Sequence, residues 1–357
     1  MNALRRTAPA ALVALLLASG CRQPLLRTDF EQDPRAAGWQ CEAVGKRGME
    51  CKWVGSLLEP GAAHLLATDG RWRSPLMPVR PLEYYRLRFR SRAPQGGYWA
   101  AVFYDEGGAA LTADNYSAIF PSKDWTRNEF CFEAESDAAG ARILFQSAED
   151  GPVRVDDVSV HPISRAAAAR WAGRVYAELP PLQYEPPRPR GRHIPRTMDR
   201  LRAGETITVV MLGDSIVNDT ANSCWDAVLE RAWPGARIRL ISSVRGGTGC
   251  AYYQREGRVR QYVTRHDPDL VIIGGISHNY QAEPIRRVVQ QVREQTDAEV
   301  LVMSGAVPSP ESRMEDMVRF GGLSREAARR RFDTFREQLP QMVREEKVEF
   351  LDMFTAW

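Results

Sequence analysis

The chain has 357 residues and a formal net charge of +3, from 48 basic and 45 acidic residues. This near balance excludes a strongly basic nucleic-acid-binding protein, so no nucleic-acid partner is expected. Lysine occurs only at positions 46, 52, 123 and 347, and the many arginines are interspersed with acidic residues. We therefore interpret the arginine content as a feature of composition and not as a binding patch. The length is sufficient for two domains and a linker.

Residues 1–21 form a predicted targeting segment. Two arginines, at positions 5 and 6, precede an apolar run, residues 10–18, that is too short to span a bilayer and leads into "LLASGC". This pattern resembles a bacterial lipoprotein signal, which implies cleavage before Cys21 and lipidation of that cysteine. The alternative is an ordinary secretory signal with an incidental cysteine. Both interpretations predict export. The first also predicts a lipid anchor in a membrane, and Arg22, standing where an aspartate would indicate inner-membrane retention, favours the outer membrane.

The pattern from residue 29 to residue 162 predicts a β-sandwich domain. Apolar and polar residues alternate in "YYRLRFRSR" (84–92), "GYWAAVFYDEGG" (97–108), "ARILFQS" (141–147) and "VRVDDVSV" (153–160). Turn-forming Gly, Pro and Asp residues break up these runs, and the region has no helical periodicity of any length. Short strands separated by turns are typical of two packed antiparallel sheets.

The same region resembles the jelly-roll carbohydrate-binding modules. The resemblance rests on "DFEQDPRAAGWQ" (29–40), "DWTRNEFCFEA" (124–134) and the closing strand "VRVDDVSV". It implies a jelly-roll fold and a carbohydrate, such as an acylated polysaccharide, as the partner. Aromatic rings can stack on sugars, and the alternative is that they fill the core of the sandwich. The candidates are Trp39, Trp53, Trp72, Trp99 and Trp125.

Five cysteines remain after Cys21, in a chain whose expected export permits disulfide bonds. We predict the pairs Cys41–Cys51 and Cys224–Cys250, which leaves Cys131 free. The sequence alone does not determine this connectivity.

Residues 163–203 are predicted to connect two domains. An alanine-rich helix ends near Leu179, and a proline-rich stretch follows that cannot form a sheet or the interior of a helix. This stretch is interpreted as a linker or a strap along the surface.

Residues 204–357 show alternating strands and helices. The strand candidates are "TITVVML" (206–212), "ARIRLIS" (236–242), "DLVIIGG" (269–275), "AEVLVMS" (298–304) and "VEFLDM" (348–353). Apolar strands that alternate with helices predict a parallel, doubly wound α/β sheet covered on both faces. Ligands bind such sheets beyond the C-terminal ends of the strands, and Ser215 follows the first strand.

Two short motifs make this domain resemble the SGNH or GDSL-type hydrolases. "LGDSIV" (212–217) matches the first motif of the family, and "SVRGGTGC" (243–250) matches its second. The resemblance implies a flavodoxin-like sheet of five parallel strands, with Ser215 as the nucleophile after Gly213 and Asp214. It also implies an oxyanion hole that uses the N–H groups of Ser215 and Gly246, with Gly247 as the alternative. The competing interpretation of Ser215 is a serine that only caps a helix.

The third motif departs from the family pattern. The family carries Gly-x-Asn-Asp after the third strand, whereas this chain has "DLVIIGGISHNYQ" (269–281). An ungapped match places His278 at the asparagine position and Asn279 at the aspartate. A match that keeps the glycine selects Ser277 instead. We predict His278 as the third oxyanion donor, because an imidazole N–H can donate as an amide does. The alternative is a loop histidine that is hydrogen-bonded locally.

The general base is missing from the pattern. The family takes its base from a late Asp-x-x-His motif, and none of the five histidines has an aspartate three residues before it. The chain stops after "KVEFLDMFTAW" (347–357), which we interpret as the fifth strand. We therefore expect a C-terminally incomplete domain, or otherwise a degenerate hydrolase, with little activity in the 357-residue chain.

The function predicted from these patterns is a serine esterase that acts on acyl, chiefly acetyl, esters of a carbohydrate. The alternatives are an O-acyltransferase acting on a surface polysaccharide and a non-catalytic glycan-binding lipoprotein. No metal or organic cofactor is predicted, because the sequence has no clustered His/Cys ligand spacing and no phosphate-binding glycine loop.

Overall fold

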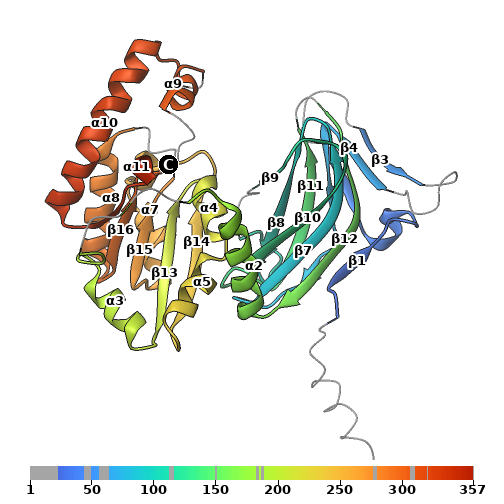
Figure 1. Cartoon of the computed structure of the whole chain (residues 1–357), viewed down its shortest axis with the longest axis horizontal. Coiled ribbons are helices and arrows are strands. Elements are labelled where there is room, and N and C mark those ends of the chain that lie inside the picture. The colour runs from blue at the N-terminus through green and yellow to red at the C-terminus, as the bar shows by residue number, and fades with distance from the viewer. Residues whose placement is uncertain are drawn as a thin grey trace, which may run out of the picture.

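The computed structural model describes residues 23–43, 50–55, 64–111, 116–148, 151–181, 185, 189–275, 280–305, 310–319 and 321–356. Antiparallel β-sheets form the N-terminal part, and a five-stranded parallel sheet with helices forms the C-terminal part (Figure 1). Cys21 and the rest of the predicted targeting segment lie outside the described residues. No helix within the described ranges is long and apolar enough to cross a membrane.

Two antiparallel sheets face each other in the N-terminal domain. The first, the β7 sheet, has the order β10-β7-β12-β4-β3, with β1 paired to β12. The second, the β8 sheet, has the order β2-β5-β11-β8-β9, with β6 paired to β11. The strands of the β7 sheet are β1 (Leu26–Thr28), β3 (Glu50–Val54), β4 (His64–Thr68), β7 (Tyr84–Ala93), β10 (Ser122–Glu133) and β12 (Val153–Ile163). Those of the β8 sheet are β2 (Gln40–Ala43), β5 (Gly70–Arg73), β6 (Met77–Pro78), β8 (Gly97–Tyr104), β9 (Ser117–Ile119) and β11 (Gly140–Ser147), and a 3₁₀ turn covers Pro34–Ala37.

Most of the candidate tryptophans fill the core between the two sheets. Trp39, Trp72 and Trp99 are 2%, 1% and 5% exposed and belong to one buried cluster. Trp53 packs against that cluster, and its indole N–H donates to the Phe30 carbonyl at 2.7 Å. Trp125 differs, because its half-buried ring lies between Arg90 and His64, outside the core cluster. Among the five candidates, Trp125 is therefore the one that neither lies in the core cluster nor packs against it.

The disulfide predictions have opposite outcomes. Cys41 and Cys51 form a disulfide bond. The prediction of a Cys224–Cys250 bond is wrong, because both residues are free. Cys250 lies in the buried cluster on one face of the parallel sheet, whereas Cys224 lies with Cys131 in a cluster at the domain junction. The sheet therefore separates the two thiols.

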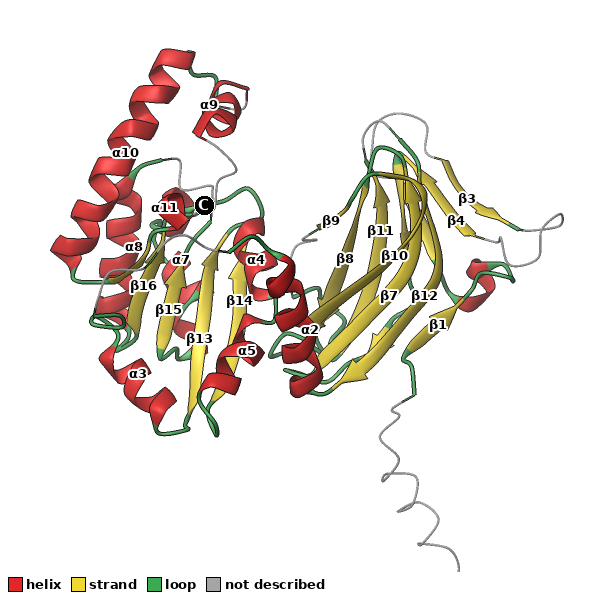
Figure 2. Cartoon of the chain, in the orientation of Figure 1, coloured by secondary structure: helices red, strands yellow, loops and turns green. Residues whose placement is uncertain are grey.

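The helix α2 (Arg165–Glu178) lies between the two domains (Figure 2). The Ser164 hydroxyl caps it by accepting from the N–H of Ala167. Its small residues Ala168, Ala169 and Ala172 are buried among side chains of β7, β10 and α5 (Trp225–Ala232). An alanine-rich face permits this close approach on both sides.

The C-terminal sheet has the order β14-β13-β15-β16-β17, and every neighbouring pair is parallel. Its strands are β13 (Thr206–Gly213), β14 (Arg237–Val244), β15 (Leu270–Ile273), β16 (Glu299–Met303) and β17 (Glu349–Leu351). The remaining helices are α3 (Pro195–Arg202), α4 (Ser215–Ala221), α6 (Cys250–Tyr253), α7 (Arg258–Tyr262), α8 (Ala282–Gln295), α9 (Pro310–Arg319), α10 (Arg325–Glu346) and α11 (Met353–Ala356), with a 3₁₀ turn at Thr264–His266. Val209 and Met211 belong to one buried cluster and Val210 and Leu212 to another, so both faces of β13 are covered.

The last residues differ from the interpretation of residues 347–357 as the fifth strand. The strand ends at Leu351, and Phe354 lies in the short helix α11. Its ring contacts Phe332 and Phe335 of α10, with centroids 5.7 and 6.0 Å apart. The Ser304 hydroxyl accepts from the Phe354 N–H at 3.1 Å and lies 3.4 Å from a carboxylate oxygen of Asp352. Packing against α10 therefore covers the ring of Phe354, for which the sequence alone offered no partner.

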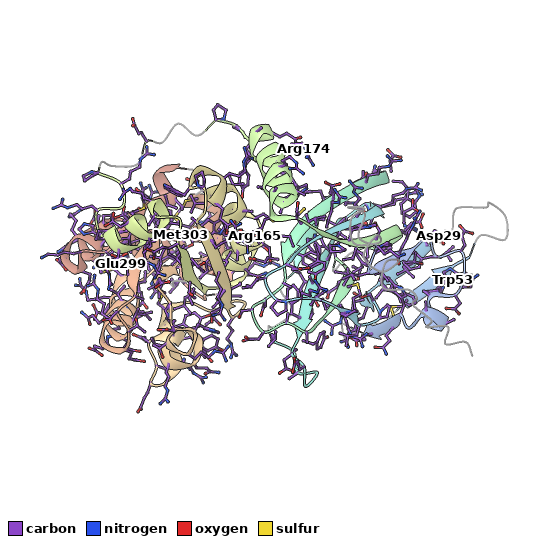
Figure 3. The ribbon with its side chains drawn as sticks, turned by 90° about the horizontal axis from the view of Figure 1, so that it is seen from below. Asp29, Trp53, Arg165, Arg174, Glu299 and Met303 are labelled. Atoms are coloured by element: carbon purple, nitrogen blue, oxygen red, sulfur yellow. A yellow bond between two sulfur atoms is a disulfide. The ribbon has the colours of Figure 1, made fainter. Side chains whose placement is uncertain are left out.

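An ionic cluster joins the two domains around Arg165, which lies between them (Figure 3). Its guanidinium lies 2.9 Å from a carboxylate oxygen of Glu133 in β10, and 2.6 and 3.6 Å from those of Glu230 and Asp226 in α5. Tyr84 of β7 donates its hydroxyl to Asp226. Burial raises the pKa of Glu133 and of Asp226. One cation thus neutralises acidic groups from both domains. We call Arg165, Tyr84, Glu133, Asp226 and Glu230 the Arg165 cluster.

Replacement of Arg165 by methionine should destabilise the protein by about 3 kcal/mol or more at pH 8, because it leaves acidic groups buried without their cation. The loss should be smaller at pH 5. Without the guanidinium, the pKa values of these carboxyl groups rise further, so the variant loses more stability than the wild type as pH increases. Urea unfolding at the two pH values measures the difference.

Arg174→Met is the matched control, because Arg174 lies on the same helix with its side chain 65% exposed. This change should alter the unfolding free energy by no more than about 0.5 kcal/mol. An Arg165→Met penalty that is equal at pH 5 and pH 8 would contradict the electrostatic account.

Candidate active site

Ser215 is the first residue of α4, which begins two residues after the strand β13. The N-cap of this helix is Asp214, whose side chain accepts from the N–H of Ile216 at 3.0 Å. Ser215 is half-buried, and its side chain makes no hydrogen bond within the described part of the chain. Asp214 therefore performs the capping that the alternative interpretation assigned to Ser215.

The turn that presents Ser215 is fixed by hydrogen bonds to Gly213. Its carbonyl accepts from the Arg245 N–H at 3.1 Å and from the Tyr253 hydroxyl at 2.6 Å. A Cβ at position 213 would lie 2.5 Å from the Gly274 carbonyl oxygen and would also overlap Val217. Only glycine fits there, so the backbone before Ser215 has little freedom.

The residues directly after β15 pack closely against the same turn. Gly275 has a positive φ of 105°, and a Cβ there would lie 2.6 Å from a carboxylate oxygen of Asp214. The Gly274 N–H donates to the Leu212 carbonyl at 3.0 Å. Gly274 had no role in the sequence-based prediction of the site, and Gly275 entered it only through the alternative match that selects Ser277. Their pairing at the end of a predicted strand was the available signal.

Strand register places two of the predicted oxyanion donors at one edge of the sheet. Gly213 pairs with Val244, and Leu212 pairs with Ile273. Ser215, Gly246 and Gly275 each lie two residues beyond the ends of β13, β14 and β15, which are adjacent and parallel. Gly246 is exposed, and Gly247 has a positive φ of 63° in the same turn. The strand order reverses at β13, because β14 lies on one side of it and β15 on the other. Ligands bind open α/β sheets at such a point.

The other predicted donors, Ser277, His278 and Asn279, lie outside the described residues. The described residues on either side, Gly275 and Tyr280, connect the end of β15 to the start of α8. The place of His278 in the chain, after β15, therefore rests on the sequence alone, and its role as an oxyanion donor stays a prediction.

The described histidines occupy other parts of the molecule. His64 and His161 belong to the β-sandwich. His193 donates its backbone N–H to Glu349 at the start of β17, which is the opposite edge of the sheet from Ser215. His266 precedes β15, and burial together with Arg265 lowers its pKa to about 4. Among the described ranges, no histidine lies in the residues that come directly after the C-terminal end of a parallel strand.

The N-terminal domain reaches the helix that carries Ser215. The Ser117 hydroxyl of β9 donates to a carboxylate oxygen of Asp219 in α4 at 3.2 Å. Asp219 lies one helical turn after Ser215. Burial, with a further contribution from the negative charge of Asp214, raises the pKa of Asp219 to about 6. Sequence patterns do not predict this pair, because nothing local relates residues in different domains.

No protein-family model and no curated protein sequence matches the chain. Similar solved structures include carbohydrate-binding modules and a two-domain esterase. The CBM22-1 xylan-binding domain of Paenibacillus barcinonensis Xyn10C is 11% identical over 41% of this chain and 99% of that domain, with a TM-score of 0.31. The two-domain esterase (CEX) active on acetylated mannans is 17% identical over 46% of this chain and 43% of its own, with a TM-score of 0.33.

The enzymatically active domain of tailspike protein 4 from bacteriophage CBA120 is 15% identical over 38% of this chain, with a TM-score of 0.32. This chain spans only 20% of the tailspike chain. At these TM-scores, the similarities assign neither a fold nor an activity.

Asp219→Asn should change how stability depends on pH. The unfolded carboxyl has a pKa of about 3.9, and the folded value is raised to about 6. The wild type therefore loses the contribution of protonated Asp219 as pH rises from about 4 through 6. An asparagine cannot ionise and still accepts from Ser117, so the variant should gain stability relative to the wild type over that interval. Urea unfolding at pH 4 to 8 measures this gain.

Asp333→Asn, at a side chain that is 61% exposed, serves as the control and should follow the wild-type curve. A constant difference between Asp219→Asn and the wild type across the whole range would refute the assignment of buried, protonated Asp219.

Proposed function

We propose that the chain is a serine ester hydrolase of the SGNH type that removes acyl groups, chiefly acetyl, from a carbohydrate. The observation that carries the proposal is the position of Ser215. Asp214 caps the helix, so the Ser215 hydroxyl is not used for capping. Ser215 follows a turn fixed by Gly213 and Tyr253. It lies at the edge of the sheet where β14 ends and the loop with Gly246 begins. The family motifs at these positions support the same assignment.

The proposed mechanism begins with attack of the Ser215 hydroxyl oxygen on the acyl carbonyl carbon. A tetrahedral intermediate forms, and its negative oxygen accepts hydrogen bonds from the N–H groups of Ser215 and Gly246. Collapse expels the sugar hydroxyl and leaves an acyl-serine, which water hydrolyses to release the carboxylic acid. Each step requires a group that takes or returns a proton. The motifs present do not supply the family's base for this role.

His278 is assigned as the third oxyanion donor, at the position where the family carries asparagine. Its ring N–H would donate to the oxygen that becomes negative in the transition state. The same histidine is the first candidate for the base if the chain proves active, because it follows β15 in the chain and Ser215 lies beyond the same ends of the strands. Substitution separates these two roles.

A carbohydrate ester is the proposed substrate because the N-terminal domain has the motifs of the jelly-roll modules and is joined firmly to the α/β domain. The Arg165 cluster and the Ser117–Asp219 hydrogen bond connect the domains at two points. A sugar chain held by the sandwich would therefore remain close to the α/β domain. Lipid anchoring at Cys21 is proposed to hold the exported protein on the outer membrane.

A non-catalytic glycan-binding protein is the second candidate. It is favoured by the absence of a histidine beyond the parallel strands in the described ranges. Retained binding of a glycan, with no ester hydrolysis above that of Ser215→Ala, would select this alternative. Measuring acetate release and acetyl transfer separately distinguishes a hydrolase from an acyltransferase.

Ser215→Ala should abolish all ester hydrolysis that depends on the protein. Loss of the nucleophile in a serine hydrolase with a complete triad costs on the order of 10⁴ to 10⁶ in rate. The loss here should be smaller, because the starting rate without the family's base is low. Acetate release from an acetylated polysaccharide and from an activated acetyl ester are the measurements. The variant should keep its unfolding midpoint, since the Ser215 side chain makes no hydrogen bond to the described residues.

His278→Asn and His278→Ala should differ if His278 is an oxyanion donor. The asparagine amide N–H can replace the imidazole donor, whereas alanine should lower kcat by about 10² to 10³. If both variants lose activity equally and the rising limb of the pH profile disappears, His278 is the general base and its assignment to the oxyanion hole is wrong.

A further inference from the structure

Arginines cover the outer face of the strand β7, which lies between β10 and β12. Along β7, the buried residues Leu87 and Phe89 alternate with arginines whose side chains point away from the core. These outward residues are Arg86, Arg88, Arg90 and Arg92. The period-two pattern thus gathers on one face the arginines that the composition alone presents as dispersed. On this strand the arginines are therefore gathered on one face and are not dispersed.

Neighbouring strands extend the same basic face. Arg127 of β10 lies opposite Arg90, and Arg154 of β12 lies opposite Arg92. Arg27 of β1 pairs with Ser159, which in turn lies opposite Arg88. Directly paired residues on adjacent strands share a face of the sheet, so these side chains and those of β7 form one surface. We call it the arginine face.

Several arginines of this face form no ion pair with a described residue. Glu129 pairs with Arg88 at 2.6 Å, and Asp157 pairs with Arg90 at 3.4 Å. In contrast, five arginines of this face form no ion pair anywhere in the described part of the chain: Arg27, Arg86, Arg92, Arg127 and Arg154. The Nε of Arg86 is buried without a hydrogen-bond partner among the described residues. Unpaired cations concentrated on one face attract an anionic ligand.

A groove crosses the arginine face. It has a volume of about 1120 Å³ and is lined by residues that include Arg27, Arg88, Arg127, Asn128 and His161. Small-molecule pockets are commonly about 300 to 1,000 Å³, so this groove suits a longer chain. Trp125 lies next to the face, with the guanidinium of Arg90 5.2 Å from the centre of its ring. It is the one candidate tryptophan outside the core.

We propose that the arginine face binds a polysaccharide that carries carboxylate groups along its chain, a polyuronate. Arginine binds carboxylates through paired N–H donors, which fits Arg27 and Arg127, the unpaired arginines that line the groove. The inference rests on the proposed function and deepens it, because it states which class of carbohydrate the sandwich presents to the α/β domain. Binding itself does not require Ser215.

The carboxylates that line the groove favour a polyuronate over duplex DNA. Asp29, Glu129 and Asp157 line it together with the arginines. Carboxylates accept hydrogen bonds from hydroxyl groups, which a sugar chain carries on every ring and the backbone of duplex DNA lacks. The groove therefore matches a chain that carries both carboxylates and many hydroxyl groups.

The test compares two ligands that differ in whether their carboxyl groups are ionised or methyl-esterified. Polygalacturonate and its fully methyl-esterified form share one backbone, and titration calorimetry at low and high salt measures the binding of each to the full chain and to Ser215→Ala. We expect binding of the acid form, at least about tenfold weaker binding of the ester form, and weaker binding at higher salt. Ser215→Ala should bind as tightly as the wild type, so that failure of catalysis and failure of binding are separate results.

Arg27→Gln/Arg127→Gln should lower the affinity for the acid form by about tenfold or more, because it removes two unpaired cations. The matched control is Arg80→Gln/Arg329→Gln, at side chains 77% and 74% exposed outside the arginine face. Unfolding midpoints establish that both variants fold. Equal binding of the acid and ester forms, an unchanged affinity of the first variant, or tighter binding of duplex DNA or of anionic lipid vesicles at the same salt concentration would each overturn the proposal.

Discussion

The relative position of the two domains depends on the guanidinium of Arg165. Burial of a carboxylate costs free energy unless a cation and hydrogen bonds compensate for the lost hydration. Here Glu133 comes from the sandwich and Asp226 and Glu230 from α5, so neither domain can bury its own acids without Arg165 between them. The Glu230 carboxylate also accepts from the Ile238 N–H at 2.7 Å, which ties the cluster to the first residues of β14. The interface between the two domains therefore combines apolar contacts with ionic contacts that fix the orientation of one domain relative to the other.

This fixed orientation brings parts of the sandwich to the site. Strand β9 meets α4 through Ser117 and Asp219, and Asp219 lies one turn from Ser215. Strand β7 begins at the Arg165 cluster with Tyr84, β10 ends there with Glu133, and both strands carry the arginine face farther along. Arg88 lies only four residues, about 13 Å, from Tyr84. A ligand on the arginine face is therefore held by the same strands that set the position of the α/β domain.

Local patterns predicted the elements well and their partners poorly. The apolar run before Ser215 defined β13 to within one residue, because strands buried on both faces are continuous hydrophobic segments. The Cys224–Cys250 pairing failed because spacing does not show on which face of a sheet a residue lies. The Arg165 cluster could not be predicted because Glu133 and Arg165 lie far along the chain from Asp226 and Glu230, which share the helix α5. The arginines of "YYRLRFRSR" alternate with apolar residues, which predicts that they share one face of a strand. The overall arginine content of the chain does not show this alternation.

The geometry of the Ser215 turn bears on whether this serine has a chemical role. A helix start requires one capping group, and Asp214 supplies it. Capping does not require a tyrosine hydroxyl on the preceding carbonyl, nor glycines at positions 213 and 275 that leave no space for a Cβ. These constraints fix the backbone on both sides of Asp214 and leave the hydroxyl of Ser215 without a partner in the described part of the chain. Rigid placement of an unused hydroxyl is what a nucleophile needs, because attack depends on positioning before it depends on a base.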